Sequence, residues 1–154
     1  MQVSELMTTE LITATPEMTL QEAETLFSAN SISGAPVIDQ GDLVGVISQS
    51  DIIRVLNDEQ LAANEISQYL LSPYPISIPA LSEIAQERAA IAQRLVDMTV
   101  GDAMTGVPVT VSPTDQISVV AQAMLAERVH RVLVTQRGEL VGLVSSLDLA
   151  TLLV

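Results

Sequence analysis

Length, composition and charge exclude several classes of protein. The 154 residues include no cysteine, and only 2% of them are aromatic. A chain without cysteine has neither a disulfide framework nor a thiolate metal site. The formal net charge of −13 repels phosphate backbones, and few aromatic rings are available to stack on bases, so nucleic-acid binding is disfavoured.

The chain is a tandem repeat. At an offset of 97 residues, 14 of 54 aligned positions are identical without a gap. A unit of this length is too short to bury a good core alone, so the two copies are expected to pack on each other. The identical pairs include Val3 and Val100, Gly45 and Gly142, Ser48 and Ser145, Asp51 and Asp148, and Leu56 and Leu153.

The first copy predicts the element order β-α-β-β-α. Thr19 and Glu22 match a capping box at the start of its first helix. Gln40-Gly41 separates two short apolar runs, which indicates a β-hairpin. The predicted elements are a strand at Leu11–Ala14, a helix at Leu20–Ala29, strands at Ala35–Asp39 and Leu43–Ser48, and a helix at Asp51–Asn57.

The second copy predicts the same order, with its hairpin turn at Arg137-Gly138. Its predicted elements are a strand at Pro108–Val111, a helix at Ile117–Glu127, strands at Arg131–Thr135 and Leu140–Ser145, and a helix at Leu147–Leu153.

A connector separates the copies. It has a predicted helix around Glu59–Leu71 and a second one at Leu81–Val96, with a kinked, proline-containing segment between them. The second helix places apolar residues at helical spacing on one face. These helices either cap the core or form a subunit interface.

The doubled set of motifs resembles a CBS-domain pair, or Bateman module, of the stand-alone regulatory type. Each copy carries Met-Thr at its start and Gly-x-x-Ser-x-x-Asp at its last strand-to-helix turn, and the first copy has Ala35-Pro36-Val37-Ile38-Asp39 on its second strand. The resemblance implies an α/β (α+β) fold in which two β-α-β-β-α motifs pack as a pseudo-two-fold pair. Motif 1 then spans residues 1–57, the helical connector 58–99, and motif 2 100–154.

The same resemblance implies a regulatory sensor of adenosine-containing ligands. Such pairs bind AMP, ADP, ATP or S-adenosylmethionine in two clefts, and they commonly form homodimers with a disc of four motifs. No effector domain is recognisable, so the resemblance also implies an unknown effector protein as partner, or a higher homo-oligomer.

The Ser-x-x-Asp turns have two interpretations. A serine at the N-cap and an acid three residues later form a helix cap. A carboxylate can also accept both ribose hydroxyl protons, and one turn can serve both roles. By resemblance, Asp51 and Asp148 are the ribose ligands.

The resemblance divides the remaining site residues between two clefts. His130-Arg131 replaces Ser33-Gly34 of the first copy, and an arginine fork suits phosphate. The cleft of Asp51 is therefore expected to bind phosphate better, with Arg54 as a helper, and the cleft of Asp148 to be weaker. Cleft 1 comprises Ser48, Ser50, Asp51, Arg54, Thr110, Val111, Ser112, Val129, His130 and Arg131. Cleft 2 comprises Thr13, Ala14, Thr15, Ile32, Ser33, Gly34, Ser145 and Asp148.

The supply of positive charge limits the ligand. One or two arginines and a histidine suit a monophosphate or a diphosphate, so AMP is the first choice and ADP the second. ATP would need more counter-charge or a bound Mg²⁺. Two alternatives stay open: a sensor of S-adenosylmethionine or another adenosyl compound, and a dimerisation scaffold without ligand.

Enzymes, metal sites and membrane proteins are poorly supported. The chain has one histidine and no lysine, and it lacks a Gly-rich phosphate loop, so nucleophilic, Schiff-base and P-loop chemistry lack their parts. No His, Asp and Glu cluster has the spacing of metal ligands. The N-terminus does not resemble a secretory signal, and the longest uncharged run, 66–82, contains three prolines. We therefore expect a non-catalytic cytoplasmic protein without a membrane partner.

Overall fold

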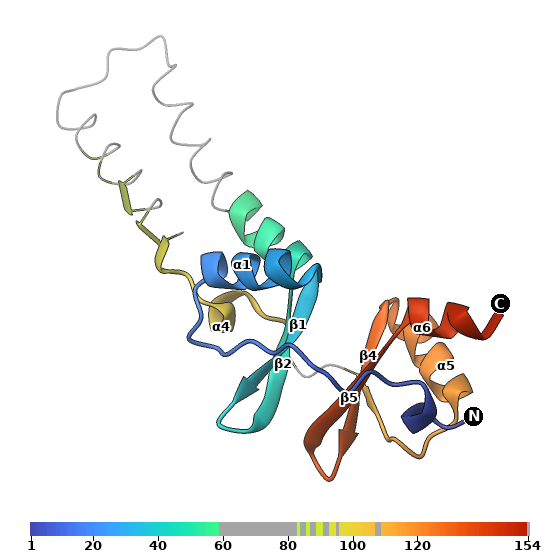
Figure 1. The fold of residues 1–154 in the computed structure, drawn as a ribbon. Coiled ribbons are helices and arrows are strands. Elements are labelled where there is room, and N and C mark those ends of the chain that lie inside the picture. The colour runs from blue at the N-terminus through green and yellow to red at the C-terminus, as the bar shows by residue number, and fades with distance from the viewer. Residues whose placement is uncertain are drawn as a thin grey trace. The chain divides into compact units, whose positions relative to one another are not determined.

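The structure is a computed structural model that describes residues 1–58, 83, 86, 89–90, 93–94, 96–106 and 109–153 (Figure 1). The predicted helix at Glu59–Leu71 lies outside these residues. The described residues between 83 and 97 are helical, as the sequence predicts for 81–96. The bounded elements are η1 (Val3–Glu5), α1 (Leu20–Asn30), β1 (Gly34–Asp39), β2 (Asp42–Ser48), α4 (Val100–Ala103), β3 (Thr110–Val111), α5 (Ile117–Glu127), β4 (Arg131–Gln136), β5 (Glu139–Ser145), α6 (Ser146–Ala150) and η2 (Thr151–Leu153).

The chain divides into two compact units. Unit 1 contains Met1–Thr15, Ala35–Val46 and Thr105–Val154, and unit 2 contains Pro16–Gly34 and Ile47–Met104. These units do not coincide with the two sequence repeats, because the start of the chain and most of the first hairpin belong to the unit that contains most of the second repeat.

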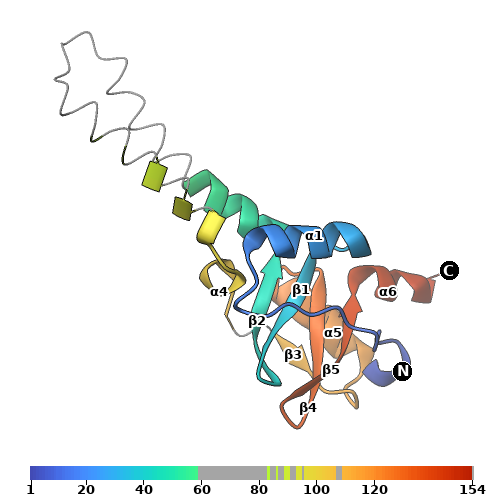
Figure 2. The same cartoon turned by 60° about the vertical axis from the view of Figure 1, so that its left-hand side comes forward.

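Unit 1 is built on a three-stranded sheet with the order β3-β4-β5 (Figure 2). β3 runs parallel to β4, with Thr110 opposite Leu133. β4 and β5 are antiparallel, and this pair extends from Arg131 opposite Ser145 to the turn. Since side chains alternate along a strand, one face of this sheet carries Val132 and Val134 and the other carries Arg131 and Leu133.

An aliphatic core covers the first of these faces. α5 and α6 lie on the same side of the hairpin in Figure 1. Leu149 of α6 is partly buried against this core. The fully packed residues, all aliphatic or methionine, are Val3, Val111, Val120, Met124, Val132, Val134 and Val144. The predicted helix at Ile117–Glu127 is confirmed with the same bounds.

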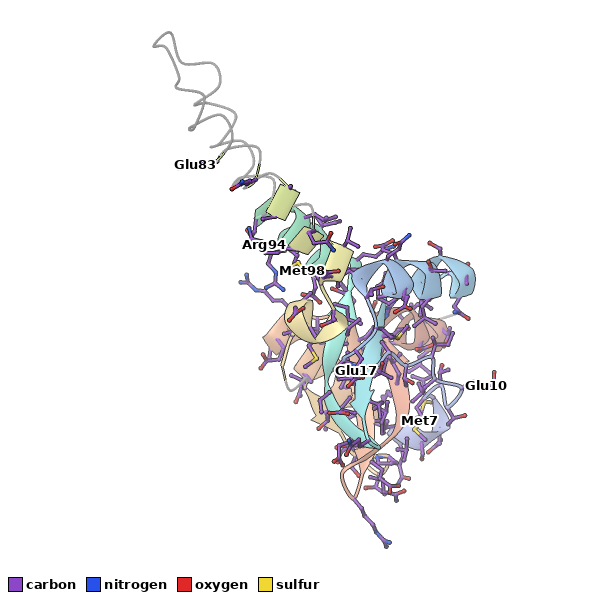
Figure 3. All side chains as sticks on the ribbon, turned by 90° about the vertical axis from the view of Figure 1, so that its left-hand side faces the viewer. Met7, Glu10, Glu17, Glu83, Arg94 and Met98 are labelled. Atoms are coloured by element: carbon purple, nitrogen blue, oxygen red, sulfur yellow. The ribbon has the colours of Figure 1, made fainter. Side chains whose placement is uncertain are left out.

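The beginning of the chain adds to unit 1. Thr8 forms an antiparallel bridge with Leu143, with mutual backbone hydrogen bonds of 2.9 and 3.0 Å. Met7, labelled in Figure 3, packs so closely on Gly142 that a Cβ atom there would lie 2.6 Å from its sulfur. The glycine common to both repeats is thus required at position 142 for close packing.

Both hairpins turn as the sequence predicts. Gln40 and Gly41 have φ of 48° and 91°, and Arg137 and Gly138 have φ of 55° and 86°. Two consecutive residues with positive φ are typical of the type I′ turn, whose twist matches that of paired strands. The second residue of each turn is a glycine, which adopts this conformation without steric cost.

Helix α1 and the short helix α4 organise the described part of unit 2. The predicted capping box of α1 is confirmed, because Thr19 Oγ1 accepts from the Glu22 amide at 3.1 Å and Glu22 Oε2 accepts from the Thr19 amide at 2.8 Å. α4 is held to the entry of α1 by two bonds, from the Val100 amide to Met18 O and from the Gly101 amide to Pro16 O. Arg94 and Met98 lie along the chain that leads into α4 (Figure 3).

Three predicted elements differ from the structure. The strand expected at Leu11–Ala14 is reduced to one bridge between Ala14 and Val37, since only Ala14 makes ladder bonds and Pro16 soon follows with no N–H to donate. β3 spans Thr110–Val111 without Val109, and the predicted first residue, Pro108, lies outside the described residues. The last helix begins at Ser146, directly after its cap, and changes to a 3₁₀ turn at Thr151, whose hydroxyl donates to Asp148 O at 2.6 Å.

Among the described residues, no helix has both the length and the apolar character needed to cross a bilayer.

Candidate functional site

The Ser145 turn of unit 1 is a capping box with one carboxylate oxygen left over. Asp148 Oδ2 accepts from the Ser145 amide and from the Ser145 hydroxyl, both at 2.7 Å, and Ser145 Oγ accepts from the Asp148 amide at 3.2 Å. Asp148 Oδ1 accepts no hydrogen bond from any residue that the structure describes. The turn therefore fixes the carboxylate and still offers one oxygen to a ligand.

An arginine, Arg131, lies beside this turn in the neighbouring strand. Arg131 is opposite Ser145 in the antiparallel pair, so the two side chains leave the sheet on the same face with Cβ atoms about 5 Å apart. Arg131 is exposed, and within the described part of the chain its side chain makes no salt bridge. Thr110, opposite Leu133 in β3, belongs to the same face.

The neighbours of Arg131 differ in what they offer. The carbonyl of His130 accepts from the Ser146 amide at 2.9 Å, and the exposed His130 side chain makes no hydrogen bond with the described residues. Val129 is exposed. By contrast, Val111 is buried in the core of unit 1, so its side chain lies on the opposite face from Arg131.

Ser112 is already engaged in a turn of its own. Its amide donates to Asp115 Oδ2 at 2.8 Å, and its hydroxyl lies 3.0 Å from Thr114 Oγ1. Ser112 follows β3 in the direction of the far end of β4, away from Arg131.

Thr13, Ala14 and Thr15 also belong to unit 1. Ala14 is buried, and its amide and carbonyl bond to Pro36 O and to the Ile38 amide, both at 2.9 Å. Thr13 and Thr15 are exposed on either side of it.

In unit 2, the Ser48 turn has the same helix cap as the Ser145 turn, but the second carboxylate oxygen of its aspartate is already bound. Asp51 Oδ2 accepts from the Ser48 amide and hydroxyl at 2.9 Å each, and Ser48 Oγ accepts from the Asp51 amide at 3.3 Å. Asp51 Oδ1, however, accepts from Arg54 Nη2 at 3.1 Å, and the same nitrogen donates to Ala103 O at 3.1 Å. The two turns thus share their cap and differ at the second carboxylate oxygen.

The remaining residues of unit 2 lie around the same turn. The Gln49 amide donates to Ser33 O at 3.0 Å, and a Cβ at Gly34 would lie 2.9 Å from Ile47 O. This close approach excludes a side chain at the position where the second repeat has Arg131. Ser50 is exposed on the first turn of the helix over residues 49–58, and the Ile32 amide donates to Phe27 O.

The structure therefore brings together residues of the same repeat. His130 and Arg131 adjoin Ser145 and Asp148 within unit 1, and Ser33 and Gly34 adjoin Ser48 and Asp51 within unit 2. The crosswise clefts predicted from sequence each draw on both units, so their assembly stays a prediction. Among the described residues, no group of three or more His, Cys, Asp and Glu side chains could hold a metal ion.

The engagement of Arg54 was missed from the sequence. The signal was present, since an acid and an arginine three residues apart on a helix are neighbours on its surface. What the spacing does not reveal is the second contact, to the carbonyl of a residue 49 positions away.

Comparisons with known proteins agree with this architecture. The CBS domain profile matches residues 3–58 and 100–154. An uncharacterized protein of Methanocaldococcus jannaschii, MJ1426, is 31% identical over 133 residues, which cover 84% of this chain and 77% of that protein. The chain belongs to the CBS domain family, as its doubled motifs predict.

Solved structures of CBS-domain pairs share the fold. CBSX2 in complex with AMP matches with a TM-score of 0.71 at 22% identity, over 99% of this chain and 95% of that chain. The CBS domain pair of protein MJ0100, in complex with 5′-methylthioadenosine and S-adenosyl-L-methionine, matches with a TM-score of 0.67 at 22% identity, over the full length of both chains. The tandem α+β fold predicted from sequence is thereby confirmed.

Proposed function

We propose that the chain is a regulatory module that binds an adenosyl ligand at the Ser145 turn. In this proposal the open Oδ1 of Asp148 accepts the ribose hydroxyls, and Arg131 binds the phosphate from the same face of the sheet. The observation that carries the proposal is the combination of a fixed carboxylate with an unused oxygen and an arginine that starts opposite the capping serine.

The proposal reverses the order of the two sites that the charges alone suggest. In the crosswise arrangement, His130 and Arg131 belong to the cleft of Asp51, which favours that cleft as the phosphate site. The second oxygen of Asp51 is already bound to Arg54, whereas that of Asp148 has no partner among the described residues. A ligand at Asp51 must displace a cation before it binds, and a ligand at Asp148 displaces only water.

AMP is the first candidate ligand and ADP the second. A single arginine fork matches one phosphate bidentately. ATP without Mg²⁺ would bring more negative charge than AMP to a chain whose formal net charge is −13, so ATP would need a bound Mg²⁺. CBSX2 with AMP and the MJ0100 pair with S-adenosyl-L-methionine show that this fold accepts both kinds of adenosyl compound. S-adenosylmethionine is the alternative, favoured by the acidity of the chain.

A second copy of the chain is the proposed route for the signal. Leu56 and Leu153 are identical in the two repeats, yet both are exposed, at 41% and 87%. Most apolar residues common to both copies serve the core, so exposed identical leucines suit an interface that both repeats use. Binding would then act on a partner protein through the shape of a homodimer.

Calorimetric titration of the chain with AMP, ADP, Mg-ATP, 5′-methylthioadenosine and S-adenosylmethionine tests the proposal. We expect saturable binding with AMP tightest. Tighter binding of S-adenosylmethionine would favour the alternative sensor. No heat with any of the five compounds would contradict a ligand-binding role and favour the dimerisation scaffold.

A further inference from the structure

The first repeat contains a contact without counterpart in the second. Arg54 Nη2 bonds both to Asp51 Oδ1 and to Ala103 O, each at 3.1 Å. The aligned residue of the second repeat is Thr151, whose hydroxyl donates instead to the backbone oxygen of Asp148. The difference therefore concerns the carboxylate oxygen that would face a ribose.

We propose that Arg54 closes the Asp51 turn in the absence of ligand, and that a ligand which takes Asp51 releases the carbonyl of Ala103. The inference rests on the proposed adenosyl function, because it assumes the same carboxylate chemistry at the first turn. It adds a regulatory role for Arg54, which competes with the ligand for Asp51 and does not assist it.

The ion pair between Arg54 and Asp51 is exposed enough for a ligand to displace it. The Arg54 side chain is 59% exposed and that of Asp51 13%. An exposed ion pair contributes little net free energy because water screens it, so a ribose can displace this one. The cost of displacement lowers the apparent affinity of the closed turn, as for any site that is only partly in its competent state.

The position of Ala103 in the chain links the contact with Arg54 to other elements. Ala103 is the last residue of α4, which is itself bound to Met18 and Pro16 at the entry of α1. Two residues further along, at Thr105, the chain leaves unit 2 and enters unit 1. Arg54 thus ties the Asp51 turn to one of the four segments at which the chain passes from one unit to the other.

The effect of Arg54→Gln on ligand affinity decides between a competitor and a helper. The Asp51 turn is isolated by making Arg54→Gln in an Asp148→Asn background and titrating both proteins with AMP and 5′-methylthioadenosine. We expect the protein with Arg54→Gln and Asp148→Asn to bind both compounds about fivefold tighter than the protein with Asp148→Asn alone. Arg137→Gln, at the exposed β4–β5 turn, makes the same change in charge and should leave the affinity unchanged.

Weaker or unchanged binding in the Arg54→Gln protein overturns the inference, since a phosphate-binding arginine would lose affinity. If Asp148→Asn alone does not alter ligand binding, the proposed site at Asp148 is wrong. The effect of Arg54→Gln is then measured with Asp148 intact, so the role of Arg54 is tested independently of that site. Hydrogen exchange without ligand supplies a second readout. Arg54→Gln and Asp51→Asn should each speed exchange of the Met104 amide, which bonds to Val100 O, and together should do no more than either alone.

Discussion

Arg131 and Ser145 stand directly opposite each other in the β4–β5 pair, and the Ser145 hydroxyl donates to Asp148 Oδ2 at 2.7 Å. A cation of the sheet and a carboxylate of α6 thus adjoin one serine, without a salt bridge between them among the described contacts. This arrangement suits a ligand that carries a phosphate at one end and a diol at the other, and it makes the contribution of each group separable.

Arg131→Gln should weaken AMP and spare uncharged adenosyl compounds. Loss of a charge-assisted pair to phosphate is expected to raise the Kd of AMP by about tenfold or more, while that of 5′-methylthioadenosine changes little. Calorimetry at fixed salt provides both values, with Arg137→Gln as a control for net charge. Equal weakening of the two compounds would mean that Arg131 shapes the site and does not bind the phosphate.

Gly142→Ala should destabilise the chain through Met7. The added methyl would lie 2.6 Å from the Met7 sulfur and 3.0 Å from its Cγ, in a buried position. Overpacking of this kind costs about 1–3 kcal/mol, measured as the free energy of unfolding in urea. Gly106→Ala, whose Cβ would meet nothing within 4 Å, is the matched control.

Shortening Met7 should relieve the clash. In a Gly142→Ala background, Met7→Ala is expected to recover part of the lost free energy, with a coupling of about 1 kcal/mol in a double-mutant cycle. Additive effects would show that the close approach of these two residues does not explain the glycine.

Leu153→Asp should shift the chain toward monomer if the exposed leucines form the proposed homodimer. A charge in an apolar interface is unfavourable, whereas an exposed substitution changes folding stability by only about 0.5 kcal/mol. Sedimentation velocity measures the mass. Leu125→Asp is the control, because Leu125 is 81% exposed and the first repeat has Ser28 in its place. Dissociation by both variants, or by neither, would contradict an interface shared by the repeats.

Local signals predicted most of the fold. The capping residues Thr19 and Glu22 define the start of α1, and Gln40-Gly41 and Arg137-Gly138 define two hairpins, because these structures depend on residues close in sequence. The prediction of a strand at Leu11–Ala14 was wrong. A short edge strand depends on the residues that it pairs with, and the partner of Ala14 lies 23 residues away at Val37.

The two helix caps of the candidate site were predicted from the sequence, and the order of the two turns as ligand sites stays a prediction. Ser-x-x-Asp identified both turns. Whether Asp51 or Asp148 has an oxygen to offer depends on the rotamer of Arg54 and on the position of Ala103, which is 49 residues from it. Likewise, the strand register places Arg131 opposite Ser145 of its own repeat, while its place in a crosswise cleft stays a prediction. These are tertiary facts that motif spacing does not contain.

The affinity of AMP for Asp148→Asn, compared with Asp51→Asn, tests the central claim most directly. Both variants retain an acceptor oxygen for the serine cap, and Asp102→Asn changes a carboxylate with the same capping bonds, to Thr99, outside either turn. We predict that Asp148→Asn weakens AMP by about tenfold or more and that Asp51→Asn and Asp102→Asn leave the tight site intact. A larger loss with Asp51→Asn than with Asp148→Asn would contradict the account.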